Sequence, residues 1–180
     1  MILLARHGET DDNAPPRRVQ GRRNPPLNDR GREQARELAA AVAGEGLAAL
    51  WTSDMRRARE TAAIVAAEVG LEPRVDPRLA EGDWGSWQGR LIEDIAREDA
   101  ELWAAFLRAG PDFRFPDGES LAEHMARVSE ALDEIAEGPS PALVVCHGGT
   151  IRCAFARTHP RGLDAFHEIV PANGQVMPLP

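Results

Sequence analysis

Several features are absent or scarce in this sequence, and each absence narrows what the chain can be. Tyrosine does not occur, cysteine occurs twice, and no apolar run approaches the length that crosses a membrane. Cys146 and Cys153 do not form a CxxC pair, so neither a disulfide framework nor a structural zinc site is indicated, and we expect reduced thiols. The opening "MILLA" is too short for a signal peptide and lacks its basic flank.

A net positive charge is also missing. The formal net charge of −8 at pH 7 repels nucleic acid and anionic membranes, so we expect neither as a partner. An anionic small molecule remains compatible with it, because clustered arginines create a positive pocket on an acidic protein. With 180 residues, 43% of them hydrophobic, the chain suits one folded domain. We therefore expect a single cytoplasmic domain over residues 1–180.

Short apolar strands are expected at four places. "MILLAR" at 1–6 and "ALVVC" at 142–146 are continuously apolar, as in strands buried on both faces of a parallel sheet. "LAALWTS" at 47–53 indicates a third strand. Two prolines limit residues 72–81 to a short edge segment.

Helical patterns alternate with these strands. Three segments carry a helical period, namely residues 31–42, 58–69 and 121–135, and residues 91–109 are also expected to be helical. Gly70 suits the end of the helix at 58–69, and Ser120 suits the start of the helix at 121–135. Proline-rich residues 11–30 and residues 110–118 are expected to be loops. The alternation predicts an α/β fold, a three-layer α/β/α sandwich with a mostly parallel central sheet.

Two histidines follow two of the expected strands. His7 and His147 each come directly after an apolar strand and before a glycine. In open α/β sheets, ligands bind beyond the carboxyl ends of the strands, so the two imidazoles share a pocket if their strands are neighbours. Arg6 and the "RRAR" run at 56–59 would supply guanidinium groups, which suit phosphate oxygens. Hydrogen-bonded structural histidines fit the same pattern.

Such a pocket contains the groups needed for phosphoryl transfer. A neutral imidazole can attack phosphorus while arginines and a second imidazole stabilise the charge on the equatorial oxygens. A carboxylic acid then protonates the departing oxygen and later takes a proton from water. This scheme requires no metal and no cofactor.

Six sequence blocks resemble the histidine phosphatase superfamily, in its phosphoglycerate mutase-like branch. They occur in family order over nearly the whole chain: "RHGETDDN" at 6–13, "QGRRNPPLNDRGREQA" at 20–35, "SDMRRARETA" at 53–62, "LAEGDWGSWQG" at 79–89, "PDGES" at 116–120 and "CHGGTIR" at 146–152. Three positions depart from the usual family residues, namely Asp12, Asn24 and Asn28, and they affect the rim of the pocket rather than a reacting group.

The resemblance implies a role for each matching residue. His7 is the implied phosphorylated nucleophile and Glu81 the implied proton donor. Three further residues, His147, Arg6 and Arg57, complete the implied catalytic set. Substrate binding is assigned to Asn13, Gln20, Gly21 and the backbone N–H of Gly148.

Some neighbouring residues have a plainer interpretation. Asp83 lies two residues from Glu81 and is an alternative proton donor. Trp84 and Trp87 more often pack than line a pocket, and Cys146 is interpreted as packing.

Other charged residues and histidines receive no catalytic role. Arg56 and Arg59 are expected on the solvated face of a helix, and His124 is expected to face solvent or a helix boundary. His159 and His167 lie outside every block and are assigned nothing.

The resemblance implies a metal-independent phosphatase acting on a small-molecule phosphate monoester. Substrates within the family include α-ribazole 5′-phosphate, sugar phosphates and glycerates. The alternative is a phosphoglycerate mutase, but mutases are typically longer, and only about thirty residues separate Gly89 from Ser120 to form a lid, approximately at 90–120. A non-catalytic phosphate-binding module is the third alternative. Arginines at 17, 18, 22 and 23 either bind a second anionic group or form a solvated loop. The sequence leaves a monomer and a homodimer both open.

Overall fold

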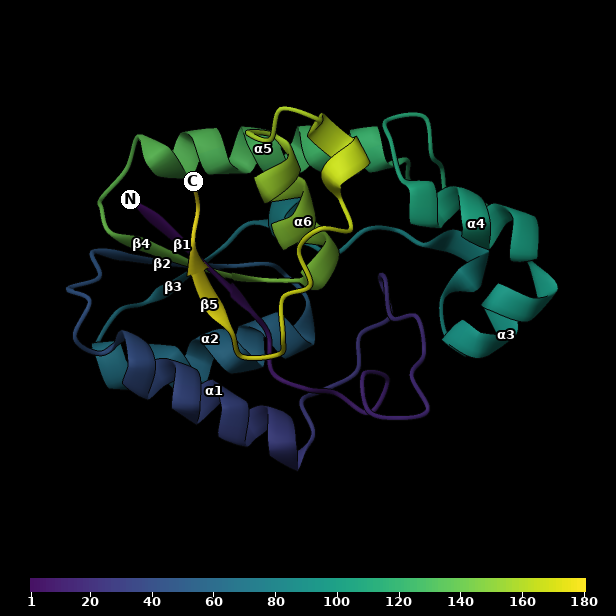
Figure 1. The fold of residues 1–180 in the computed structure, drawn as a ribbon. Helices are drawn as coiled ribbons and strands as arrows, with labels where there is room; N and C mark the ends of the chain where they lie inside the picture. Colours follow the sequence, from purple (N-terminus) through teal and green to yellow (C-terminus); the bar gives the residue numbers. More distant parts are fainter.

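The computed structural model describes residues 1–180 and contains a five-stranded sheet with helices on both faces (Figure 1). The strand order is β3-β2-β4-β1-β5. Four strands are parallel, and the fifth runs antiparallel to β1. Their bounds are β1 Ile2–Arg6, β2 Ala49–Thr52, β3 Pro73–Val75, β4 Ala142–Cys146 and β5 Val176–Pro178. This arrangement confirms the predicted α/β fold with a mostly parallel sheet.

Two pairs of helices form the outer layers. In Figure 1, α1 (Asp29–Val42) and α2 (Arg56–Val69) lie on one side of the sheet. The other side is covered by α5 (Leu121–Ala136) and α6 (Gly148–Ala156). Each layer has its own apolar cluster against the sheet, one with α1 and α2 and one with α5 and α6. No helix is both long enough and apolar enough to cross a membrane.

The helix ends follow local sequence signals. Asn28 caps α1 by accepting the N–H of Gly31, so this helix begins two residues before the predicted start. Gly70 ends α2 in the left-handed conformation, with φ +70°, as predicted. Ser120 and Glu123 form a capping box at the start of α5, which confirms Ser120 as its cap.

Two expectations about secondary structure were wrong or incomplete. The segment at 91–109 is not one helix but two, α3 (Ile92–Glu98) and α4 (Ala100–Arg108). The break falls at Asp99. The Asp99 carboxylate accepts hydrogen bonds from Trp87 Nε1 (2.7 Å) and Arg90 (2.6 Å), which hold this residue at the junction of the two helices. The edge strand β5 was not predicted, since three residues that include a proline give little signal without their partner β1.

The register of the two central strands determines where the site forms. β1 and β4 are adjacent and parallel, and Arg6 is paired with Cys146. His7 and His147 therefore leave the sheet side by side at its carboxyl edge. α3 and α4 lie beyond that edge, to one side of the sheet (Figure 1).

Candidate active site

The two predicted histidines meet, as their strand positions indicated. Their ring centroids are 5.1 Å apart, with the planes tilted by 57°. Both side chains are almost completely buried, with 1% and 0% of their surface exposed for His7 and His147. The site therefore contains two imidazoles in close contact, shielded from bulk water.

His7 is held in one tautomer by its hydrogen bonds. Its Nδ1 lies 2.6 Å from the carbonyl oxygen of Gly8, and because a carbonyl only accepts, Nδ1 carries the proton. Nε2 is then unprotonated and accepts a hydrogen bond from Arg57 Nε at 3.1 Å. Burial lowers the pKa of His7 well below its ordinary value, and the charges of Arg57 and Arg6 lower it further. The ring is neutral at pH 7, with its lone pair on Nε2.

His147 is oriented by a residue that the sequence did not single out. Its Nε2 lies 2.7 Å from Oγ of Ser53, which is fully buried after the end of β2. Its Nδ1 is buried and has no hydrogen-bond partner. Burial, followed by the charge of Arg57, lowers the pKa of His147 well below its ordinary value. The available signal for Ser53 was its place at the end of a strand within a matching block.

Two buried arginines surround the histidines. Arg57 donates to the carbonyl oxygens of Arg23 (2.7 Å) and Gly21 (2.9 Å). Arg6 donates to the carbonyl of Pro171 at 2.8 Å, while its Nε is buried without a partner. Burial lowers the pKa of both Arg6 and Arg57 to about 10. Both therefore remain charged at neutral pH, and neither has a carboxylate partner among the ion pairs of the structure.

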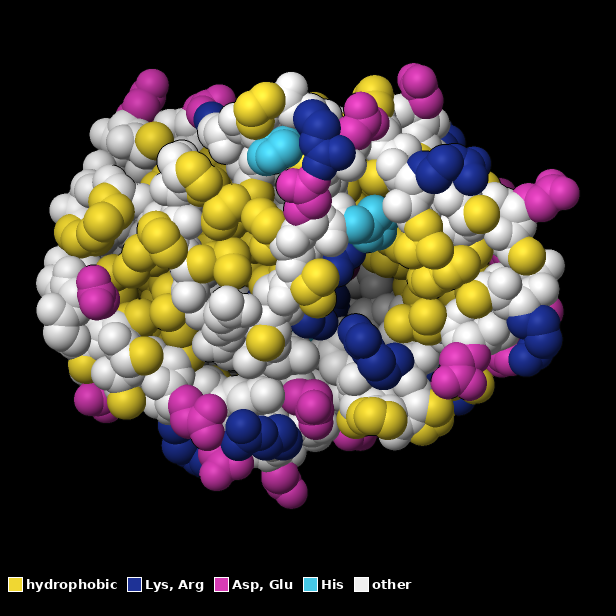
Figure 2. All heavy atoms as spheres, in the orientation of Figure 1, with side chains coloured by type: hydrophobic (Ala, Val, Ile, Leu, Met, Phe, Trp, Pro, Cys, Tyr) yellow, Lys and Arg dark blue, Asp and Glu magenta, His cyan; other side chains and the backbone are white.

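A pocket of about 310 Å³ opens in front of these groups. Figure 2 shows it as a hollow with basic side chains against one side and hydrophobic side chains on the other. Arg57 and His147 contact His7 without lining the pocket. The other seven of the nine predicted site residues line it: Arg6, His7, Asn13, Gln20, Gly21, Glu81 and Gly148. Arg152 and His167 also line the pocket, although sequence reasoning assigned neither a role.

Loop residues around His7 are fixed by mutual contacts. Asn173 donates to the backbone oxygen of His7 (3.0 Å) and to Oδ1 of Asn13 (3.2 Å). A Cβ on Gly8 would lie 2.2 Å from the carbonyl oxygen of Gly31, which no side chain tolerates. The glycine after His7 therefore permits close packing of the backbone against the start of α1.

Glu81 is positioned by backbone donors. Its Oε2 accepts the N–H of Gly149 (3.1 Å), and Oε1 accepts the N–H of Gly82 (3.0 Å). Burial alone would raise the pKa of Glu81, but the His124 imidazole and these two N–H groups outweigh it and keep the pKa below its ordinary value. A Cβ at position 149 would lie 2.4 Å from Glu81 Oε1, so only glycine leaves room for the carboxylate.

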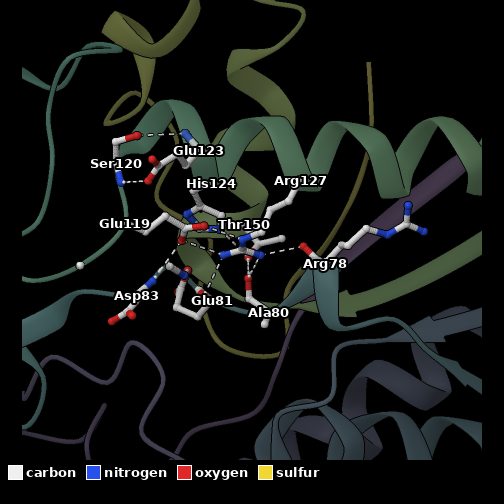
Figure 3. Close-up of polar contacts among 12 residues, drawn as sticks. Arg78, Ala80, Glu81, Asp83, Glu119, Ser120, Glu123, His124, Arg127 and Thr150 are labelled. Atoms are coloured by element: carbon white, nitrogen blue, oxygen red, sulfur yellow. Dashed lines mark hydrogen bonds and ion pairs between the residues drawn. The ribbon is translucent and has the colours of Figure 1, made fainter.

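The segment that carries Glu81 is anchored by an ion pair (Figure 3). Arg127 on α5 binds Glu119 through Nε (2.7 Å) and Nη2 (2.9 Å). The same guanidinium donates to the carbonyl oxygens of Arg78, Ala80 and Glu81 at 2.7, 2.7 and 3.0 Å. One largely buried side chain thus holds the backbone of residues 78–81, up to the residue that carries the carboxylate.

The prediction that His124 faces solvent or a helix boundary was wrong. Only 1% of its surface is exposed, and its Nε2 lies 3.2 Å from Oγ1 of Thr150 on α6 (Figure 3). Burial lowers the pKa of His124 to about 3, so the ring is neutral. His124 is three residues after Leu121 and four before Val128, which places it on the buried stripe of α5. That spacing was the signal that sequence reasoning missed.

The remaining candidates near Glu81 are structural or line the wall. Asp83 does not line the pocket, and its Oδ1 accepts the N–H of Gly85 at 3.0 Å. Trp87 is fully buried and packs, as expected. Trp84 both packs and lines the pocket, since it stacks on Phe115 with ring centroids 4.4 Å apart.

Known proteins share this fold and its sequence blocks. The pattern of the histidine phosphatase superfamily (branch 1) matches residues 2–179. The "Probable phosphoglycerate mutase GpmB" of Serratia proteamaculans is 38% identical over 170 residues, which are 93% of this chain and 77% of that protein. A putative alpha-ribazole-5′-P phosphatase from Escherichia coli superposes with a TM-score of 0.84 and 28% identity over 97% of this chain and 87% of that one. The mycobacterial glucosyl-3-phosphoglycerate phosphatase, in its complex with VO3, superposes with a TM-score of 0.86 and 29% identity over 97% of this chain and 88% of that one.

Proposed function

The chain belongs to branch 1 of the histidine phosphatase superfamily, and we propose that it hydrolyses small phosphate monoesters through a phosphohistidine on His7. One observation carries this proposal: the unprotonated Nε2 of His7 lies among buried cationic groups that have no carboxylate partner. Such a lone pair can attack phosphorus, and such cations stabilise a phosphoryl group.

In the first step, the Nε2–P bond forms and the bond from phosphorus to the ester oxygen breaks. Arg57 and Arg6 bind the equatorial phosphoryl oxygens, with the N–H groups at the start of α6 as further donors. Ser53 Oγ accepts the N–H of Met55 and so can donate its own proton to His147 Nε2. The unpartnered Nδ1 of His147 then carries a proton toward the phosphoryl group.

Glu81 supplies the proton for the leaving oxygen. Its lowered pKa leaves it ionised before substrate binds, and a phosphate dianion beside it raises that pKa. An ester that enters as the monoanion transfers its proton to the carboxylate, which passes it to the departing alkoxide. In the second step Glu81 takes a proton from water as the oxygen attacks phosphorus, and inorganic phosphate leaves with the Nε2 lone pair restored on His7.

Hydrolysis rather than mutase activity is supported by what surrounds the pocket. Between Gly89 and Ser120 the chain has room only for α3, α4 and a short loop, which we infer act as a lid-like cover within one domain. Leu107 and Val170 line the pocket with 54% and 72% of their surface exposed, so its rim is open to solvent. Water then has access to the phosphohistidine. A mutase is the second candidate, favoured by the name of the Serratia relative.

Two ester types test the proposal. In the presence of a chelator, we expect the wild type to hydrolyse both p-nitrophenyl phosphate and glycerol 3-phosphate, and His7→Ala to hydrolyse neither. Glu81→Gln should lose about a hundredfold or more in kcat on the alkyl ester, but less than about tenfold on p-nitrophenyl phosphate, whose leaving group needs little protonation. Glu68→Gln, an exposed acid on α2 without an ion pair, is the matched control.

Each outcome has a consequence. Equal losses on the two esters would remove Glu81 from the role of proton donor. Phosphate binding without turnover would favour a binding module, and transfer of phosphate to phosphoglycerate faster than to water would favour the mutase.

A further inference from the structure

Three buried side-chain nitrogens have no hydrogen-bond partner, and all three are at this site: Arg6 Nε, His147 Nδ1 and Arg152 Nε. A buried donor without a partner is costly, so it is usually satisfied by something that binds. Arg6 and His147 are accounted for by the phosphoryl group of the proposed reaction. Arg152 is not, because that reaction has no step that uses it.

Arg152 is oriented by contacts with His167 and Phe166 and forms no ion pair. Its Nη1 lies 3.3 Å from His167 Nδ1, while His167 Nε2 lies 2.8 Å from the carbonyl oxygen of Phe106. Because that carbonyl only accepts, Nε2 carries the proton and Nδ1 accepts from Arg152. Burial lowers the pKa of His167, which keeps the ring neutral. The guanidinium also lies over the Phe166 ring, 5.4 Å from its centroid.

The position of Arg152 separates it from the phosphoryl group. It follows Gly148 by four residues on α6, which is one helical turn or about 6 Å along the axis. Both residues line the pocket, and Gly149 between them binds the Glu81 carboxylate. An ester oxygen placed next to Glu81 therefore directs the alcohol part of the substrate along the face of α6 toward Arg152.

The wall of the pocket that faces the basic side chains is hydrophobic. Trp84, Trp103 and Phe106 line the pocket on the side of α3 and α4, and Figure 2 shows this hydrophobic wall facing the basic one. Apolar surroundings strengthen the attraction between a guanidinium and an anion. Arg17 also lines the pocket and has no ion pair, so it adds to the positive charge there.

We propose that Arg152 binds a second anionic group, a carboxylate or a second phosphate, carried by the alcohol part of the substrate. The natural substrate is then a phosphate monoester with a further negative charge a few bonds from the ester oxygen. This assignment rests on the proposed function, since it takes the phosphoryl group to lie at His7.

Matched ester pairs test the subsite. 3-Phosphoglycerate and glycerol 3-phosphate differ by a carboxylate in place of a hydroxymethyl group, and propane-1,3-diol bisphosphate and its monophosphate differ by one phosphate. We expect the wild type to prefer one or both doubly charged members in kcat/KM. Arg152→Met should reduce kcat/KM for the preferred member by roughly tenfold to a hundredfold, mainly through KM, and for its singly charged partner by less than about twofold. Arg152→Lys should restore part of the loss.

Controls separate this proposal from the proposed function. Arg36→Met removes one exposed, unpaired positive charge from α1 and should leave the preference intact. Calorimetric titration of the same pairs into His7→Ala measures the subsite even if no ester is turned over. Equal losses on both members of each pair, or no preference in the wild type, would overturn the subsite, whereas turnover of p-nitrophenyl phosphate would still support the phosphatase.

Discussion

Replacing Arg127 with methionine should be among the most damaging single changes outside the histidine pair. Arg127 makes five hydrogen bonds, two to Glu119 and three to the carbonyls of the segment that carries Glu81. Only 17% of the Arg127 side chain and 13% of the Glu119 side chain are exposed. After the substitution the Glu119 carboxylate would remain buried, with the N–H of Asp83 at 3.1 Å as its main donor.

The expected cost follows from leaving a charge buried without its partner. Breaking such a pair costs about 3–5 kcal/mol in the free energy of unfolding. Urea denaturation measures it, and Arg114→Met is the matched control, because Arg114 pairs with Glu123 on the same helix but each side chain is 54% exposed. An exposed pair contributes at most about 1 kcal/mol.

Two results would refute this reasoning. One is a loss in Arg127→Met within about 1 kcal/mol of the loss in Arg114→Met. The other concerns activity: the folded variant should be slowed more on alkyl phosphates than on p-nitrophenyl phosphate, because the support of Glu81 is removed. A uniform decrease on both esters would show that Arg127 stabilises the fold without positioning the carboxylate.

Three further outcomes are expected. Stability should fall as the pH drops from about 6.5 toward 5, because the buried histidines bind protons only when the chain is unfolded. Each histidine contributes up to about 1.4 kcal/mol per pH unit to the free energy of unfolding. Urea denaturation of His124→Gln should show the pH dependence of that free energy reduced by one proton. Gly149→Ala should slow alkyl ester hydrolysis by displacing the carboxylate that its N–H binds, whereas Gly44→Ala, which meets no atom within 4 Å, should match the wild type in the same assay. Ser53→Ala should leave His147 Nε2 unpaired, lower kcat and cost about 1–3 kcal/mol of stability by urea denaturation.

The fold was predictable where local sequence carries the information. Continuous apolar runs identified the two central strands, and the polar residues at their ends then identified His7 and His147. Ser120 and Gly70 identified helix ends because capping depends on neighbouring residues alone. Neighbouring parallel strands end at the same edge of the sheet. The two imidazoles were therefore expected to meet if their strands were neighbours.

The misses depend on contacts between distant residues. The break at Asp99 exists because Trp87 and Arg90 bind its carboxylate, and no local pattern contains that contact. Arg152 could not be found from local sequence for the same reason, since its importance comes from its contact with a neutral His167 and from the absence of an ion pair to any carboxylate. His124 differs from these, because its spacing from Leu121 and Val128 was visible in the sequence.

The most direct test of the account is to locate the phosphoryl group on the enzyme. The wild type is mixed with p-nitrophenyl phosphate, quenched within milliseconds in alkali, digested and analysed by mass spectrometry. The account predicts an acid-labile, alkali-stable phosphate on His7 that is absent from His7→Ala. Phosphate on His147, or continued hydrolysis by His7→Ala, would contradict it.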